Sequence, residues 1–365
     1  MNLLQRFIKP TQEPRRQRIW FESVDRLRLI LMLLGCINLF GFPFSCGDHV
    51  QTLMGFVAPA CFLISGFLIL AESEHRLARI LRSVKRCALA FALLAAFYLA
   101  VNVWYGAKTG ENPFAVLTSG RTWFEFLLLN VWPFPIGVSI WYVQALLYAE
   151  LIAYFLDKFH LLDKIGLWLA AALFLFSLAS GEFADLLGFR PFGYAYLPGN
   201  FLTRALPYLL FGGILARYRE LFFRVPPILF PIGTAVGIGL TAAEYFLLDL
   251  SYPGHLFGNL LIAPCFCMIA FLYPMDGFFD ESLAWFGSFA TPWIYALCPV
   301  AAFLLERLLP ASEEGSWVGI LTFVLCALAV FLVGSAIRFL YIVLLERGIL
   351  PTPDEENSQK GDHVQ

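Results

Sequence analysis

Charged side chains are scarce in this sequence, and their scarcity limits the kind of fold it can form. Asp, Glu, Lys and Arg make up 14% of the 365 residues, while 59% are hydrophobic. A soluble globular domain carries about 25% charged residues. The composition therefore argues against an ordinary soluble domain and indicates a chain solvated mostly by lipid. We expect membrane lipid, and not nucleic acid, to be the partner of its surface.

Several functional motifs are also missing. The eight cysteines form no Cys-x-x-Cys pair, and Cys265-Phe266-Cys267 is too tightly spaced for a zinc site. We interpret them as small buried apolar residues and expect no metal and no bound cofactor. The sequence has no Gly-rich phosphate loop and no internal repeat. About two dozen polar and basic residues precede the first apolar run, so we expect no cleavable signal peptide.

Long apolar segments are what the sequence has in quantity. Since about 20 apolar residues in a helix cross a bilayer core, the pattern predicts an all-α, polytopic membrane protein with about ten transmembrane helices. A further segment, Trp123–Pro135, is short and rich in Trp and Pro, and is interpreted as re-entrant or interfacial. The predicted spans are Leu29–Phe44, Gln51–Ala71, Cys87–Trp104, Val138–Leu156, Gly166–Ser180, Phe201–Ala216, Pro226–Leu248, Leu256–Leu272, Trp285–Leu305 and Val318–Ile337.

The distribution of basic residues predicts the orientation of these spans. With a cytoplasmic N-terminus, all but five of the 25 Lys and Arg residues fall on inner segments, as the positive-inside rule requires. The expected organisation is a basic cytoplasmic segment (1–23), one membrane domain (24–345) and a cytoplasmic, disordered tail (346–365). Both termini are then cytoplasmic, in the inner or plasma membrane of a cell. The five residues on outer or outward-facing segments are Lys108, Arg121, Arg190, Arg204 and Arg307.

Two groups of basic residues are candidates for binding an anionic ligand at the inner surface. Asp25 precedes Arg28 by three residues at the predicted entrance of the first span, and it could orient the guanidinium toward a phosphate. Arg79, Arg82 and Arg86 recur at helical spacing in the segment after the second span, where a helix would place them on one face. Anchoring at the interface and contact with anionic lipid are the alternative interpretation for both groups.

Ionisable residues within the predicted spans are the third candidate set. Arg204 lies near the outer end of its span, where binding an acidic or sugar substrate and a structural role are equally favoured. Glu150 and Glu244 lie nearer span ends than centres, so we expect lipid head groups to solvate them. No histidine falls within a predicted span.

These motifs, taken in order, resemble the acyltransferase-3 family of integral membrane O-acyltransferases, which modify cell-surface sugars in bacteria. Each motif alone is common, but the ordered set from about Val24 to Ile337 is specific. The segments that carry the resemblance are Asp25-Arg26-Leu27-Arg28, Cys61-Phe62-Leu63-Ile64-Ser65-Gly66-Phe67, the basic run through Arg82 and Lys85-Arg86, Ile140-Trp141-Tyr142-Val143-Gln144-Ala145-Leu146, Arg204 with Tyr208-Leu209-Leu210-Phe211-Gly212-Gly213, and Gly287-Ser288-Phe289 leading to Ile294-Tyr295-Ala296-Leu297-Cys298-Pro299.

The sequence departs from the family at both of its histidine positions. The family's Arg-x10-His spacing, counted from Arg28, ends on Leu39, beside Asn38, and the late histidine position holds Cys298. The resemblance implies that the first histidine is the general base acting on the acceptor hydroxyl. Neither Leu nor Asn titrates near neutral pH, so neither can take that role. Cys298 has no visible cationic partner and is interpreted as packing.

The resemblance implies two functions that the sequence leaves open. One is transfer of an acetyl-type acyl group from acyl-CoA to a cell-surface glycan or lipid-linked sugar in the bacterial inner membrane. Asp25, Arg28, Ser65, Arg82 and Arg86 would then lie on the donor side, with the Ser65-Gly66 step allowing close helix approach. Trp141 and Arg204 would face the acceptor. The other is a catalytically inactive relative that acts as an exporter, flippase or assembly subunit for a lipid-linked glycan.

Overall fold

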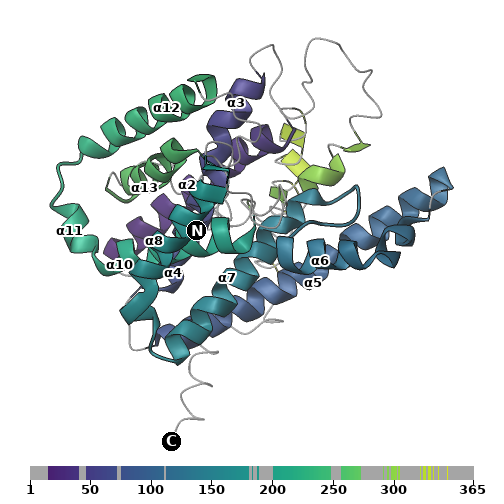
Figure 1. The fold of residues 1–365 in the computed structure, drawn as a ribbon, viewed down its shortest axis with the longest axis horizontal. Helices are drawn as coiled ribbons and strands as arrows, with labels where there is room; N and C mark the ends of the chain where they lie inside the picture. The colour runs from purple at the N-terminus through teal and green to yellow at the C-terminus, as the bar shows by residue number, and fades with distance from the viewer. Residues whose placement is uncertain are drawn as a thin grey trace, which may run out of the picture.

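A computed structural model describes residues 15–40, 47–71, 75–110, 112–180, 200–247 and 256–272, with single residues or short pieces at 183, 187–188 and between 291 and 343. These parts are helical and contain no strand, which confirms the all-α class (Figure 1). The elements are α2 (Arg15–Phe40), α3 (Gly47–Leu53), η1 (Met54–Phe56), α4 (Val57–Ile69), α5 (Arg76–Thr109), η2 (Pro113–Thr118), α6 (Gly120–Leu129), η3 (Val138–Ile140), α7 (Trp141–Lys158), α8 (Leu162–Ser180), η6 (Phe201–Ala205), α10 (Leu206–Arg217), α11 (Arg219–Phe223), α12 (Leu229–Leu247) and α13 (Phe257–Leu272).

Four helical segments in the described chain are long and apolar enough to cross a membrane. They are Val50–Ile69, Arg76–Thr109, Leu162–Ser180 and Leu229–Leu247, and Phe257–Phe271 is a shorter apolar helix. The predicted count of ten spans is thus not confirmed by the described residues. The last two predicted spans, Trp285–Leu305 and Val318–Ile337, lie outside the described residues apart from scattered positions.

Two helices begin well before the predicted spans they contain. α5 starts at Arg76, so the basic residues predicted for a loop form its first three turns. At about 1.5 Å per residue, its 34 residues extend roughly 50 Å, longer than a bilayer core is thick. α2 starts at Arg15, so Asp25 and Arg28 lie in its third and fourth turns and not at its entrance.

α4 is the central helix, and its closest neighbour is α10. A Cβ atom added to Gly66 of α4 would overlap the backbone carbonyl of Leu209 in α10. Conversely, a Cβ added to Gly212 would overlap the carbonyl of Leu63. Small residues on each helix therefore admit the backbone of the other, as in tight helix pairs within membranes. The close helix approach expected at the Ser65-Gly66 step is present.

The outer helices α5, α8 and α12 expose large apolar side chains. Leu89 and Leu93 of α5 are each 62% exposed, Trp168 of α8 is 74% exposed and Leu247 of α12 is 79% exposed. In water such faces would be unfavourable, whereas in a multi-pass membrane protein they face lipid. In Figure 1, α5 and α6 lie side by side and reach away from the region of α10, α11 and α12.

The predicted re-entrant or interfacial segment consists of α6 followed by a non-helical return over residues 130–137. The side-chain amide of Asn102 in α5 donates to the carbonyls of Tyr98 (2.7 Å) and Ile136 (2.9 Å) and accepts from the Ile136 amide (3.2 Å). Gly137 has φ 102°, and the Tyr98 ring occupies the space beside its Cα atom. Buried non-helical backbone is tolerated because the protein itself supplies its hydrogen bonds.

Candidate functional site

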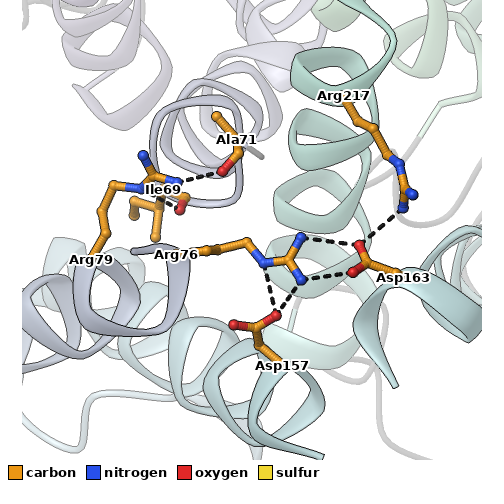
Figure 2. A network of polar contacts seen from close by, with 7 residues as sticks. All are labelled: Ile69, Ala71, Arg76, Arg79, Asp157, Asp163 and Arg217. Carbon is orange, nitrogen blue, oxygen red and sulfur yellow. Dashed lines mark hydrogen bonds and ion pairs between the residues drawn. The ribbon is translucent and has the colours of Figure 1, made fainter. Parts of the chain in front are cut away.

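One end of the helix bundle is held by an ion-pair network of Arg76, Asp157, Asp163 and Arg217, called here the Arg76 network (Figure 2). Arg76 Nε donates to Asp157 Oδ1 (2.7 Å), and its Nη1 and Nη2 atoms donate to the two oxygens of Asp163 (3.0 and 2.8 Å). Arg217 donates to Asp163 Oδ1 (2.9 Å). The network joins the first turns of α5 and α8 to the last turns of α7 and α10.

Arg79 turns away from the Arg76 network toward the end of α4, as Figure 2 shows. Its guanidinium donates to the carbonyl of Ile69 (2.9 Å) and to that of Ala71. These carbonyls lie at the C-terminal end of α4, where a helix leaves acceptors unpaired and a cation is favoured. Both Arg76 and Arg79, which the sequence places in one basic cluster, are therefore engaged by the protein itself.

The other basic residues of this cluster remain on the surface. Arg82, Lys85 and Arg86 are exposed, and Arg82 donates a long hydrogen bond (3.4 Å) to the carbonyl of Ala78 in its own helix. They lie near Arg76 and Arg79 in the first turns of α5, on the stripe that Leu89 and Leu93 continue along the helix. Arg82 and Arg86 are therefore exposed at that end of the bundle, unlike Arg76 and Arg79.

Arg28 and Asp25 form a pair beside the centre of the bundle. Arg28 Nη1 donates to Asp25 Oδ1 (3.1 Å), and the side chains are 37% and 20% exposed, respectively. Burial raises the pKa of the Asp25 carboxyl above its ordinary value, and the charge of Arg28 acts in the opposite direction. The guanidinium also acts electrostatically on Cys61 of α4 and Tyr142 of α7.

Ser65 and Tyr142 complete this group, called here the Arg28 site. The Ser65 hydroxyl donates to the carbonyl of Cys61 (3.0 Å), one turn earlier in α4, and it interacts with the Tyr142 hydroxyl. The Tyr142 ring also contacts the Tyr295 ring edge to face, with centroids 5.6 Å apart. Tyr142 is a site residue that sequence reasoning missed, because only the tertiary structure brings it to Ser65 and Phe62.

Arg204 and Trp141 form a second polar group, toward the end of the bundle opposite the Arg76 network. The Arg204 guanidinium lies over the Trp141 ring, 5.5 Å from its centroid, and donates to the Gly55 carbonyl of η1 (3.3 Å). Arg204 lies in η6, a π-helical turn that leads into α10. Asn200 caps this turn by accepting from the amides of Leu202 (2.9 Å) and Thr203 (3.2 Å). Short π-helical turns are frequent at functional sites.

The two groups are joined by aromatic rings. Trp141 and Tyr142 are consecutive at the start of α7, and both contact Phe62 of α4. The Phe62 and Tyr142 rings are stacked with centroids 4.5 Å apart, and the Phe62 and Trp141 centroids are 6.3 Å apart. Tyr142, which interacts with Ser65, and Trp141, which lies beneath Arg204, therefore meet on the ring of Phe62. Arg82 and Arg86 are exposed on α5 and are not part of this aromatic junction.

The positions of the two missing histidines can be followed only in part. Asn38 and Leu39 belong to α2, but their side chains lie outside the described residues. Cys298 is fully buried in a helical segment. His75 and His160, whose side chains are described, are exposed beside the Arg76 network, and His160 follows the end of α7 opposite Trp141.

Glu150 contradicts the sequence expectation that head groups solvate both glutamates, whereas Glu244 is partly exposed. Glu150 is only 1% exposed, because it faces α5 in the middle of α7, where Ser83 Oγ donates to its Oε1 atom (2.8 Å). Its place in the helix–helix interface, and not its distance from the span end, decides its solvation. Glu244 accepts a hydrogen bond from the Gly258 amide (3.2 Å) in the first turn of α13, where a carboxylate is favoured.

The fold and these polar groups indicate a multi-pass membrane protein that is helical over its described residues and has partly buried cationic side chains. Residues 21–339 match the profile of the acyltransferase-3 family (Acyl_transf_3), described as an acyltransferase domain. The chain therefore belongs to this family of membrane acyltransferases. No curated protein and no solved structure matches it.

Proposed function

We propose that this protein transfers an acetyl-type acyl group from acyl-CoA to a hydroxyl of a cell-surface glycan or lipid-linked sugar. The observation that carries the proposal is the junction of Trp141 and Tyr142, which places the Arg28 site beside the Arg204 group. Acyl transfer requires the thioester carbonyl of the donor and the hydroxyl of the acceptor to be held in near-attack geometry. Two cationic groups on either side of one aromatic layer suit that requirement.

On the donor side, Arg28 is the proposed anchor of an anionic part of acyl-CoA, and Asp25 orients its guanidinium. Ser65 and Tyr142 offer hydroxyl groups to the acyl carbonyl next to it. Arg82 and Arg86 are proposed to hold phosphate groups of the coenzyme at the exposed start of α5. A guanidinium is suited to phosphate because it binds two oxygens at once.

The reaction itself balances without a further reactant. The acceptor oxygen bonds to the acyl carbon, the carbon–sulfur bond breaks, and the coenzyme leaves as a thiol that carries the proton of the acceptor hydroxyl. A positioned base that relays this proton is worth about 10²–10⁴-fold in rate. Because Leu39 replaces the family histidine, we expect this chain to turn over more slowly than a relative that has it.

The arrangement of helix ends supports the proposed cytoplasmic location of the donor side. The Arg76 network and Arg79 gather the ends of α4, α7 and α10 with the starts of α5 and α8. Helices that cross a bilayer in alternating directions bring the end of one helix and the start of the next to the same membrane face. The end is rich in Arg and is the proposed cytoplasmic face of a bacterial inner membrane, with both termini on that side.

The decisive measurement is binding of acetyl-CoA to the purified full-length protein in nanodiscs, followed by transfer of labelled acetyl to a polysaccharide. We expect Arg28→Ala to abolish binding, because it removes the cation at the centre of the donor site. Arg121→Ala, which changes an arginine that is 70% exposed on α6, is the matched control and should bind normally. Unchanged affinity of Arg28→Ala would remove Arg28 from the donor site.

A second candidate function follows from the substitution of both histidines. A catalytically inactive relative would act as an exporter, flippase or assembly subunit for a lipid-linked glycan. Such a protein needs no coenzyme site, so it would neither bind acetyl-CoA nor transfer the label. Binding without transfer would favour an inactive relative that keeps the donor site.

A further inference from the structure

Asn259, in the first turn of α13, is a buried amide that the described part of the fold leaves without a partner. Its side chain is 1% exposed, and neither Oδ1 nor Nδ2 has a hydrogen-bond partner within the described part of the chain. A buried polar group without a partner costs about 1–3 kcal/mol. The preceding residue of this helix start is paired, since the Gly258 amide donates to Glu244 (3.2 Å), whereas the Asn259 side chain has no partner in the described chain.

The Asn259 amide lies against the residue that also binds Arg204. A Cβ atom added to Gly55 would lie 2.9 Å from Asn259 Nδ2, and the carbonyl of the same glycine accepts from Arg204 Nη2 (3.3 Å). Tyr208, one turn after Arg204, is 1% exposed, and its hydroxyl also lacks a partner in the described chain. Charge interaction links this hydroxyl to Arg204. Elements η1, η6 and α13 thus bring the Asn259 amide and the Arg204 guanidinium to one glycine, with the Tyr208 hydroxyl one helical turn further along α10 and the Trp141 ring beneath Arg204.

We propose that Asn259 binds vicinal hydroxyl groups of the sugar acceptor, together with Arg204 and Tyr208. The inference rests on the proposed function and names a specificity-determining residue for it. An amide both donates through Nδ2 and accepts through Oδ1. A phosphate or carboxylate cannot donate to Oδ1, whereas a pair of hydroxyls satisfies both amide atoms. The aromatic face of Trp141 suits the apolar face of a sugar ring.

A purely structural role for Asn259 predicts the opposite behaviour of one variant. If the amide only serves packing, Asn259→Leu should lower the unfolding temperature of the free protein, or it should leave the affinity for a sugar ligand unchanged. If the amide is kept for a ligand, Asn259→Leu removes an unpaired buried group from the free protein. The free variant should then unfold at the same or a higher temperature, because an apolar replacement of similar shape is neutral or stabilising.

The experiment uses the full-length protein in nanodiscs and the methyl glycosides of glucose, galactose and N-acetylglucosamine as probes. Tryptophan fluorescence titration and thermal unfolding report binding, since a ligand of the folded state raises the unfolding temperature. We expect at least one glycoside to saturate the wild type and to bind Asn259→Leu about tenfold more weakly. Thr241→Val, which removes a different buried unpaired hydroxyl on α12, is the matched control and should keep the wild-type affinity.

Three results would overturn the proposal. They are no response of the wild type to any glycoside up to its solubility limit, unchanged glycoside affinity in Asn259→Leu, and a fall in the unfolding temperature of that variant without ligand. Acetyl-CoA binding measured on the same samples separates the two inferences. If acetyl-CoA binds and the glycosides do not, the assignment of Asn259 fails and the donor site stands. If only the glycosides bind, the transferase function fails and the sugar site stands.

Discussion

At the scale of single residues, the function of a polar group in this protein depends on where its partner lies. Arg76 and Arg79 are close in sequence to Arg82 and Arg86, yet the first two are bound to the protein and the last two are exposed. Sequence spacing groups all four residues together. Only the packing of α5 against α4, α7 and α8 separates the arginines that hold the fold from those that remain exposed.

Asn102 is the clearest case of a single side chain that holds non-helical backbone inside the protein. We expect Asn102→Leu to cost about 1–3 kcal/mol for each Ile136 backbone group that it leaves unpaired. Thermal unfolding of the purified protein should show a lower midpoint. Asn112→Leu is the control, since Asn112 is exposed and water replaces its bond to the Phe114 amide (3.0 Å). Equal midpoints in the two variants would contradict the role of Asn102.

At the scale of elements, two glycines set the distance between α4 and α10. Gly66 faces the carbonyl of Leu209 and Gly212 faces that of Leu63, so the helices touch through their backbones. The Arg28 site depends on this contact, because Ser65 precedes Gly66 directly. A change that separates the two helices should therefore disturb both the fold and the site.

Gly66→Ala tests this dependence. The added methyl group overlaps the Leu209 carbonyl, and forcing extra volume into a packed interface costs about 1–3 kcal/mol. Both the unfolding midpoint and the affinity for acetyl-CoA should fall. Gly239→Ala places a methyl group in open space on α12 and should be neutral or slightly stabilising. A Gly66→Ala protein with the stability of the Gly239→Ala protein would show that the helices do not approach as described.

At the scale of the whole molecule, the Arg76 network ties four helices together at one end. Asp157 is 8% exposed and Arg76 is 17% exposed, so the loss of one partner strands a nearly buried charge. We expect Arg76→Ala to cost about 3–5 kcal/mol. Arg121→Ala breaks an exposed pair with Glu125 (2.7 Å) and should cost less than about 1 kcal/mol. Similar unfolding midpoints for the two variants would be inconsistent with a network that holds the bundle.

The orientation of the molecule in the membrane is a separate whole-molecule prediction. Arg219 follows α10 on the side of the Arg76 network, and Lys108 lies in the last turn of α5, toward the opposite side. We expect a thiol reagent that cannot cross membranes to label Arg219→Cys only from the cytoplasmic side. Lys108→Cys should be labelled only from outside. Labelling of both variants from one side would reject the proposed topology.

The sequence by itself determined the class of this protein. Low charge, long apolar runs and ordered motifs indicated an all-helical membrane protein of the acyltransferase-3 family, because lipid solvation constrains composition over the whole chain. It also located the Ser65-Gly66 step, since a small residue pair in an apolar helix marks close packing. The expected solvation of Glu150 was wrong, because linear distance from a span end does not show which face of a helix is buried.

Only the tertiary structure decided which polar groups meet. Tyr142 faces Ser65, and Asn259 lies against the glycine that binds Arg204, although these residues are distant in sequence. The reason is that helix–helix packing depends on the rotation of each helix about its axis and on backbone contact at glycines. Neither quantity is encoded in hydropathy or spacing, yet both decide that Trp141 and Tyr142 meet on the ring of Phe62.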